Sequence, residues 1–290
     1  MEIGSILQRS WDIAWKYKAL WIFGLFVQGG GGFSSIFDLS EDSPFGSITS
    51  SPAFMTLVFL GIIVGLIFLI MHFISCGAHI DAVNKLTRGG RYTFGSSFSV
   101  GVDNFWRMVG LWLLMVGAVI AVVLVLALPG VLFFVIHPAV GVLGLIILIP
   151  ALFAGLVVIL MIYWLAQRAV VVRGSGIGDS LDEAYFLFRT YIAACVKFAL
   201  VLLLIAIAFG IAVMILLAMI AAPFIAMAIA ADGGLLPALL LGIPTVGLVM
   251  LVLEGLLGSF FHSAHTLFYF RLLEAPLQQE TSGYAAAPMG

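Results

Sequence analysis

Several apolar runs in this 290-residue chain continue without a charged residue for longer than the ~18 residues that mark a transmembrane candidate. Charged residues make up 9% of the chain and hydrophobic residues 63%, whereas a soluble domain carries roughly 25% charged residues. A water-soluble core cannot account for this composition. The sequence therefore predicts an all-α integral membrane protein.

A short pattern occurs three times: Ala, then His or Gln, then Lys or Arg six residues later. The copies are Ala78-His79 with Lys85, Ala166-Gln167 with Arg173, and Ala264-His265 with Arg271. A Pro-Ala pair precedes each copy at a similar distance, and proline suits the first position of a helix, where its missing amide hydrogen would have no partner. The pattern predicts one membrane domain, 1–290, with internal repeats 1–90, 91–176 and 177–272 and a flexible cytoplasmic tail, 273–290.

Each predicted repeat starts with an amphipathic segment that carries Trp or Tyr among charged residues, which is typical of a helix in the membrane interface. A pair of apolar runs follows each segment. The six predicted membrane helices are 19–37, 52–86, 109–135, 138–172, 191–220 and 237–272. Pro129 and Pro223 are expected to kink or end their helices, because proline lacks an amide donor. No A-x-A-like cleavage site follows the first run, so we interpret it as a membrane helix and not as a cleaved leader.

The basic residues indicate the orientation. All twelve Lys and Arg residues lie in the N-terminal segment, around 85–107, around 168–197, or at 271, whereas the other connections contain acids and no Lys or Arg. Cytoplasmic loops are enriched in Lys and Arg, so both termini are predicted to be cytoplasmic. Six of these residues are candidates for contacts with anionic lipid headgroups: Lys16, Lys18, Lys85, Arg107, Arg173 and Arg271.

Trp11, Trp15 and Lys16, followed by Leu-Trp-Ile-Phe-Gly-Leu-Phe at 20–26, precede the repeated pairs of interfacial and membrane helices. This plan resembles a group of prokaryotic membrane families that includes the membrane domain beside glycerophosphodiester phosphodiesterases and the YciC-type proteins. The resemblance implies six helices and a location in the inner (plasma) membrane of a prokaryote. It implies no enzymatic activity, because this chain has no phosphodiesterase domain, and it transfers no functional residues.

The last apolar run contains Glu254 near its middle, where a charged group costs about 2.5–3.5 kcal/mol by insertion scales. Glu254 is therefore expected to face the protein interior or water. At about 100° per residue, His262 and His265 share a helix face with it. A second polar face, on the run 52–86, contains His72, Cys76 and His79, and Gln167 occupies the equivalent position in the second repeat.

These polar faces have two interpretations. They could meet as a proton or cation path, or as a metal or haem site, since His and carboxylate bind transition metals and neutral imidazole relays protons. Alternatively, they form a structural ring of polar groups satisfied by backbone, headgroups or water. Gln167 favours the structural ring over a three-histidine metal site, and no metal or cofactor is predicted.

Enzyme motifs of the GxSxG, HExxH and Walker types are absent from the sequence. Cys76 and Cys195 lie in or beside apolar runs and outside any CxxC spacing, so a disulfide scaffold is not expected. Asp179, Asp182 and Glu183 are interpreted as acids that complement a helix dipole. The chain is therefore predicted not to be an enzyme.

Three functions remain open. The first is a scaffold or accessory subunit of a membrane complex; the second is a small transporter or channel lined by Glu254 and the membrane histidines; the third is a metal- or haem-binding membrane protein. The expected partners are membrane lipids and other membrane protein subunits or further copies of the chain, with no nucleic acid.

Overall fold

The computed structural model describes residues 2–28, 52–230 and 235–285, and every regular element in these ranges is a helix. The helices are α1 (Ile3–Lys16), α2 (Leu20–Gln28), α3 (Pro52–Thr87), α4 (Phe94–Asp103), α5 (Phe105–Ile136), α6 (Pro138–Arg173), α7 (Ile177–Thr190), α8 (Ile192–Ala230) and α9 (Leu235–Ala285). The predicted all-α fold is confirmed for this part of the chain.

Five helices are long and apolar enough to cross a membrane, namely α3, α5, α6, α8 and α9. They support a multi-pass membrane protein. The first predicted crossing, 19–37, coincides in its first half with α2, and its second half lies outside the described residues. The acidic connections at 38–51 and 231–234 also lie outside them.

Proline positions agree with the predicted helix starts at α3 and α6, which begin at Pro52 and Pro138. Of the two effects expected of Pro129 and Pro223, a kink or an end, the end does not occur, because both prolines lie inside continuous helices. A long transmembrane helix tolerates one lost amide donor, since neighbouring groups and small local adjustments satisfy the freed carbonyl.

Two glycines with left-handed backbone lie at the carboxyl ends of α3 and α6, each of which precedes a short helix. Gly89, just after α3, has φ 74°, and Gly174, which caps α6, has φ 67°. Glycine adopts this conformation without a Cβ penalty and commonly ends helices in this way. By contrast, α9 continues as helix to Ala285, through most of the segment predicted to be a flexible tail.

The chain forms two compact units. The α1–α4 unit combines Glu2–Val102 with Lys197–Leu267, and so includes most of α8 and the first part of α9. The α5–α7 unit combines Asp103–Val196 with the chain from Phe268 onward.

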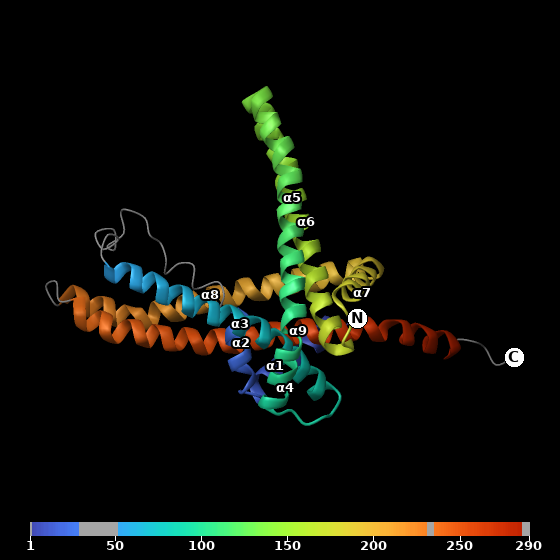
Figure 1. Cartoon of the computed structure of the whole chain (residues 1–290), viewed down its shortest axis with the longest axis horizontal. Helices are drawn as coiled ribbons and strands as arrows, with labels where there is room; N and C mark the ends of the chain where they lie inside the picture. Colours follow the sequence, from blue (N-terminus) through green and yellow to red (C-terminus); the bar gives the residue numbers. More distant parts are fainter. Residues whose placement is uncertain (1, 29–51, 231–234, 286–290) are drawn as a thin grey trace. The chain divides into compact units, whose positions relative to one another are not determined.

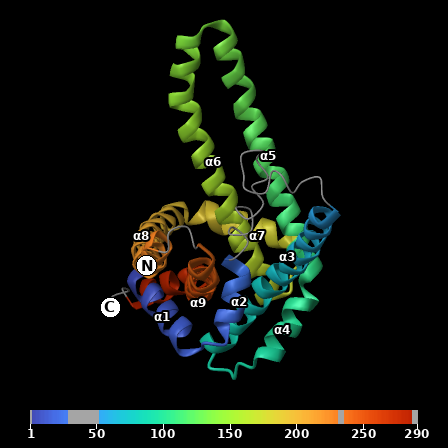
Figure 2. The same ribbon diagram turned by 90° about the vertical axis from the view of Figure 1, so that its left-hand side faces the viewer.

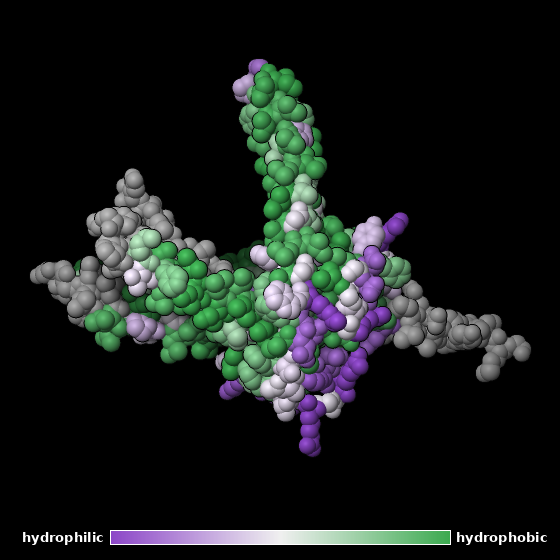
Figure 3. Space-filling view, viewed as in Figure 1, coloured by the Kyte–Doolittle hydropathy of each residue, from purple (hydrophilic) through white to green (hydrophobic). Residues whose placement is uncertain are grey.

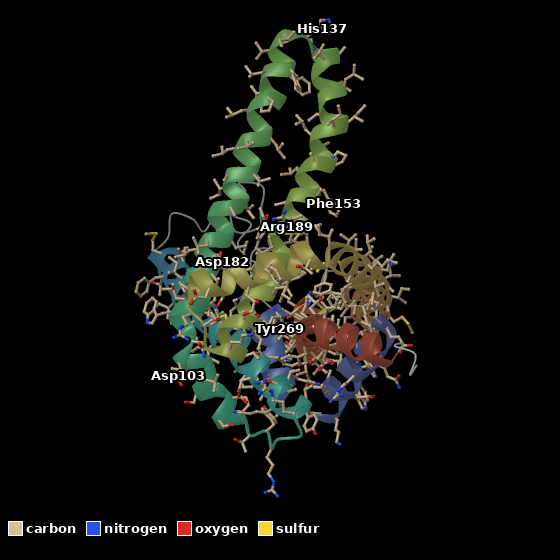
Figure 4. The ribbon with its side chains drawn as sticks, turned by 90° about the vertical axis from the view of Figure 1, so that its right-hand side faces the viewer. Asp103, His137, Phe153, Asp182, Arg189 and Tyr269 are labelled. Carbon is tan, nitrogen blue, oxygen red and sulfur yellow. The ribbon has the colours of Figure 1, made fainter. Side chains whose placement is uncertain are left out.

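In the α5–α7 unit, α5 and α6 form an antiparallel hairpin joined by His137 alone (Figure 1). Aromatic rings of α5 pack directly on glycines of α6. A Cβ on Gly141 would collide with Phe134, and one on Gly144 with Phe133. Hydrophobic side chains cover the visible face of the hairpin (Figure 3). Within this unit His137 lies at the tip, far from Asp182 and Tyr269 at the base (Figure 4).

In the α1–α4 unit, α2 packs directly on α9 through small residues (Figure 2). A Cβ on Gly24 would meet the Gly255 carbonyl oxygen and lie 2.6 Å from the Ser259 amide nitrogen. A Cβ on Gly255 would in turn lie 2.8 Å from the Trp21 carbonyl oxygen. Small residues permit such close approach of backbones in membrane helices. The contact fixes the part of α9 that carries the predicted polar site.

Candidate functional site

The structure brings together two of the predicted membrane histidines. His79 of α3 is fully buried, and its ring lies edge-to-face on that of His262 of α9, with centroids 5.4 Å apart. The sequence left open whether these two helices present their polar faces to each other, and the His79–His262 contact shows that they do within the α1–α4 unit. Edge-to-face contact is the ordinary packing of aromatic rings.

The other two membrane histidines bond backbone carbonyls. His72 donates from Nδ1 to the Phe26 carbonyl oxygen at 2.9 Å, which ties α3 to α2, and its Nε2 accepts from the Cys76 thiol at 3.8 Å. His265 donates from Nδ1 to the Phe261 carbonyl oxygen at 2.7 Å, one turn earlier in α9. The first contact links two helices, and the second holds the His265 ring against its own helix.

Histidine, cysteine, aspartate and glutamate form no group of three or more with metal-binding geometry in the ranges that the structure covers. The His79–His262 pair therefore has no third ligand of these types there.

Glu254 differs from the histidines. It is half-buried on α9, one residue before the glycine that packs on α2, and it lies well inside the span Leu240–Ala275. None of the described residues forms a hydrogen bond or ion pair with its carboxylate. A carboxylate at such depth needs a partner or water, because hydrocarbon solvates neither its charge nor its lone pairs.

Gln167, the third member of the repeated pattern, is buried in the α5–α7 unit. Its Oε1 accepts from Nη1 of Arg168 at 3.1 Å, and the same Nη1 donates to the Trp164 carbonyl oxygen at 2.8 Å. Arg168 is fully buried, although the sequence places it simply among the basic residues of the predicted cytoplasmic side. Position in a charge cluster does not reveal burial.

A second polar cluster joins three helices of the α5–α7 unit. Glu183 of α7 accepts from the hydroxyl of Tyr269 at 2.7 Å and pairs with Nε of Arg173 at 3.2 Å. Tyr269 is fully buried, and Arg173 is half-exposed. The interpretation of Glu183 as a dipole-complementing acid missed this role. The only sequence signal was that Arg173 ends the repeated pattern.

The six candidate headgroup contacts fall into two groups. Four have internal partners: Lys85 with Asp81 at 2.6 Å, Arg173 with Glu183 at 3.2 Å, Arg271 with Glu274 at 3.6 Å, and Arg107 with the Gly174 carbonyl oxygen at 3.3 Å. Lys16 and Lys18 are exposed on and after α1, and among the described residues they have no acidic partner. Of the six candidates, Lys16 and Lys18 are therefore the ones that can contact a lipid headgroup without giving up a partner inside the protein.

Comparison with known proteins identifies no relative: no family model, no curated protein and no solved structure matches this chain.

Proposed function

We propose that this multi-pass membrane protein is non-catalytic and acts as a scaffold or accessory subunit of a membrane complex. The proposal includes six crossings built from three repeats, with both termini on the cytoplasmic side of a prokaryotic inner membrane. The placement of all Lys and Arg residues on one predicted side supports this orientation.

The observation that carries the proposal is Glu254. It is half-exposed on a membrane helix, and no residue in the described ranges neutralises or hydrogen-bonds it. A membrane-embedded carboxylate costs about 2.5–3.5 kcal/mol, so a polar group from a partner subunit that reached it would stabilise the complex. Close packing of α2 on the adjacent Gly255 holds the carboxylate in a defined position.

The α5–α6 hairpin adds support. No Asp, Glu, Lys or Arg occurs between Arg107 and Arg168, and large apolar residues are exposed along both helices. With 32 residues, α5 is about 48 Å long at 1.5 Å per residue. The hydrocarbon core is about 30 Å thick. The helix is therefore longer than the hydrocarbon core is thick. A neighbouring protein would cover the apolar surface that extends beyond the core.

Replacement of Glu254 by leucine tests the proposal. Leucine removes the cost of inserting a carboxylate, so α9 inserts at least as readily, but a partner loses its polar contact. We expect the Glu254→Leu protein to accumulate normally and to co-purify with much less of its partner subunits. Glu274→Gln is the control, because it removes one acid near the end of the same helix, where Arg271 pairs with it.

A transport function is the alternative that the same residue favours, since an intramembrane carboxylate with water access can carry protons or cations. In that case Glu254→Gln abolishes flux in reconstituted vesicles and leaves the oligomeric state unchanged. Normal flux in Glu254→Gln would exclude the transport path.

A further inference from the structure

Two basic segments that are far apart in the sequence meet at one edge of the α1–α4 unit. Lys16 and Lys18 flank the end of α1, and Arg88 and Arg91 lie in the loop between α3 and α4. The rings of Tyr17 and Tyr92 join the two segments in an edge-to-face contact with centroids 6.4 Å apart. We call Lys16, Lys18, Arg88 and Arg91 the basic patch.

All four side chains of the basic patch are exposed. In the ranges that the structure describes, none of them forms an ion pair with Asp or Glu. The neighbouring Lys85 differs, because Asp81 binds it at 2.6 Å. The basic patch therefore presents positive charge to its surroundings, and no acidic side chain in the described ranges pairs with it.

Tryptophans place α1 beside the membrane. Trp11 is 36% exposed and Trp15 is 56% exposed, and the ring of Trp11 lies 6.2 Å from that of Phe209 and 6.0 Å from that of Phe260. These phenylalanines belong to α8 and α9, which are apolar enough to cross a membrane. Indole rings prefer the headgroup region. With these indole rings in the headgroup region, the basic patch at the end of α1 would lie close to the level of lipid phosphates.

Two further electrostatic effects bear on the patch. The helix dipole makes the carboxyl end of α1 partly negative. The partly positive amino end of α2, which begins at Leu20, offsets this charge. Asp12 is an exposed acid on α1, about one turn before Lys16. It reduces the positive potential along α1, but its single negative charge offsets only one of the four exposed cations, so the patch stays positive.

We propose that the basic patch binds the phosphate headgroup of an anionic membrane phospholipid. Arginine matches phosphate oxygens with a planar fork of donors, and lysine adds a compact charge. Each Lys or Arg near a membrane surface strengthens binding to anionic lipid about fivefold. The proposal depends on the membrane location of the chain and not on its role as a subunit.

Native mass spectrometry of the full chain tests the proposal. The protein is purified in a mild detergent and mixed with equal amounts of phosphatidylglycerol and phosphatidylcholine that have the same acyl chains. We expect the wild-type protein to retain phosphatidylglycerol preferentially. The double variant K18Q/R91Q, with one charge removed from each segment, should retain it at least tenfold less well.

The control R189Q/K197Q removes two exposed cations outside the basic patch and should retain phosphatidylglycerol like the wild type. Circular dichroism melting of both variants verifies that they fold. Equal loss in the two double variants, or equal retention of the two lipids by the wild type, would overturn the proposal. So would displacement of phosphatidylglycerol by millimolar inorganic phosphate, which would identify a site for free anions.

Discussion

Replacing Gly24 with alanine should destabilise the contact between α2 and α9. The new Cβ would lie 2.6 Å from both the amide nitrogen and Oγ of Ser259, and it would collide with the Gly255 carbonyl oxygen. Main-chain atoms of α9 cannot rotate away as a flexible side chain can. Ser259 Oγ also donates to the Leu20 carbonyl oxygen at 2.7 Å, and the collision would displace that bond.

The size of the effect follows from two contributions. Overpacking costs about 1–3 kcal/mol, and a side-chain hydrogen bond between membrane helices contributes about 0.6 kcal/mol. The total loss for Gly24→Ala is therefore about 2–4 kcal/mol. For a chain of this size, 1 kcal/mol shifts Tm by about 2–4 °C, so we expect a decrease of about 4–16 °C.

Thermal unfolding in detergent micelles, followed by circular dichroism, measures this shift. Gly210→Ala in α8 is the matched control, since a Cβ there meets nothing within 4 Å and alanine favours a helix more than glycine by about 1 kcal/mol. Its Tm should stay the same or rise. Equal Tm values for Gly24→Ala and Gly210→Ala would refute the close packing of α2 on α9.

Three further changes have definite expected outcomes. Glu183→Gln removes the ion pair with Arg173 and keeps an amide oxygen that can accept from Tyr269; because Arg173 is half-exposed, the loss should be about 1 kcal/mol, measured as a lower Tm that 1 M NaCl reproduces in the wild type. His265→Gln should cost less than 1 kcal/mol in the same assay, because an amide can also donate to the Phe261 carbonyl oxygen; a larger loss, or loss of a bound metal, would contradict the structural role. Burial raises the pKa of the Tyr92 hydroxyl, so the stability it contributes is present at neutral pH and is lost as alkaline pH passes the raised pKa; Tyr92→Phe should reduce this alkaline loss, and an unchanged pH profile would show that the hydroxyl does not contribute.

Helix positions could be predicted well from the sequence, because they depend on local properties. Pro52 and Pro138 begin helices where a first-position proline is expected, and five of the six predicted membrane helices are long and apolar enough to cross a membrane in the part of the chain that the structure describes. Neither Pro129 nor Pro223 ends its helix, and α8 continues to Ala230, past the predicted end at 220, because neighbouring groups in a membrane protein can satisfy the carbonyl that proline frees.

The candidate site could be predicted only in part. Periodicity grouped His262 and His265 on one face, but only the folded arrangement shows that His79 meets His262. The Tyr269–Glu183 bond joins residues far apart in the sequence, and no local pattern indicates it. Sequence periodicity gives the direction of a side chain on its own helix and not the helix that faces it.

The most direct test of the accessory-subunit proposal is native mass spectrometry of the protein extracted gently from its own membrane. We predict a stoichiometric complex with other membrane subunits, which the Glu254→Leu variant loses and the Glu274→Gln variant keeps. A lone chain or a homo-oligomer in the wild type, unchanged in both variants, would contradict the proposal and favour transport.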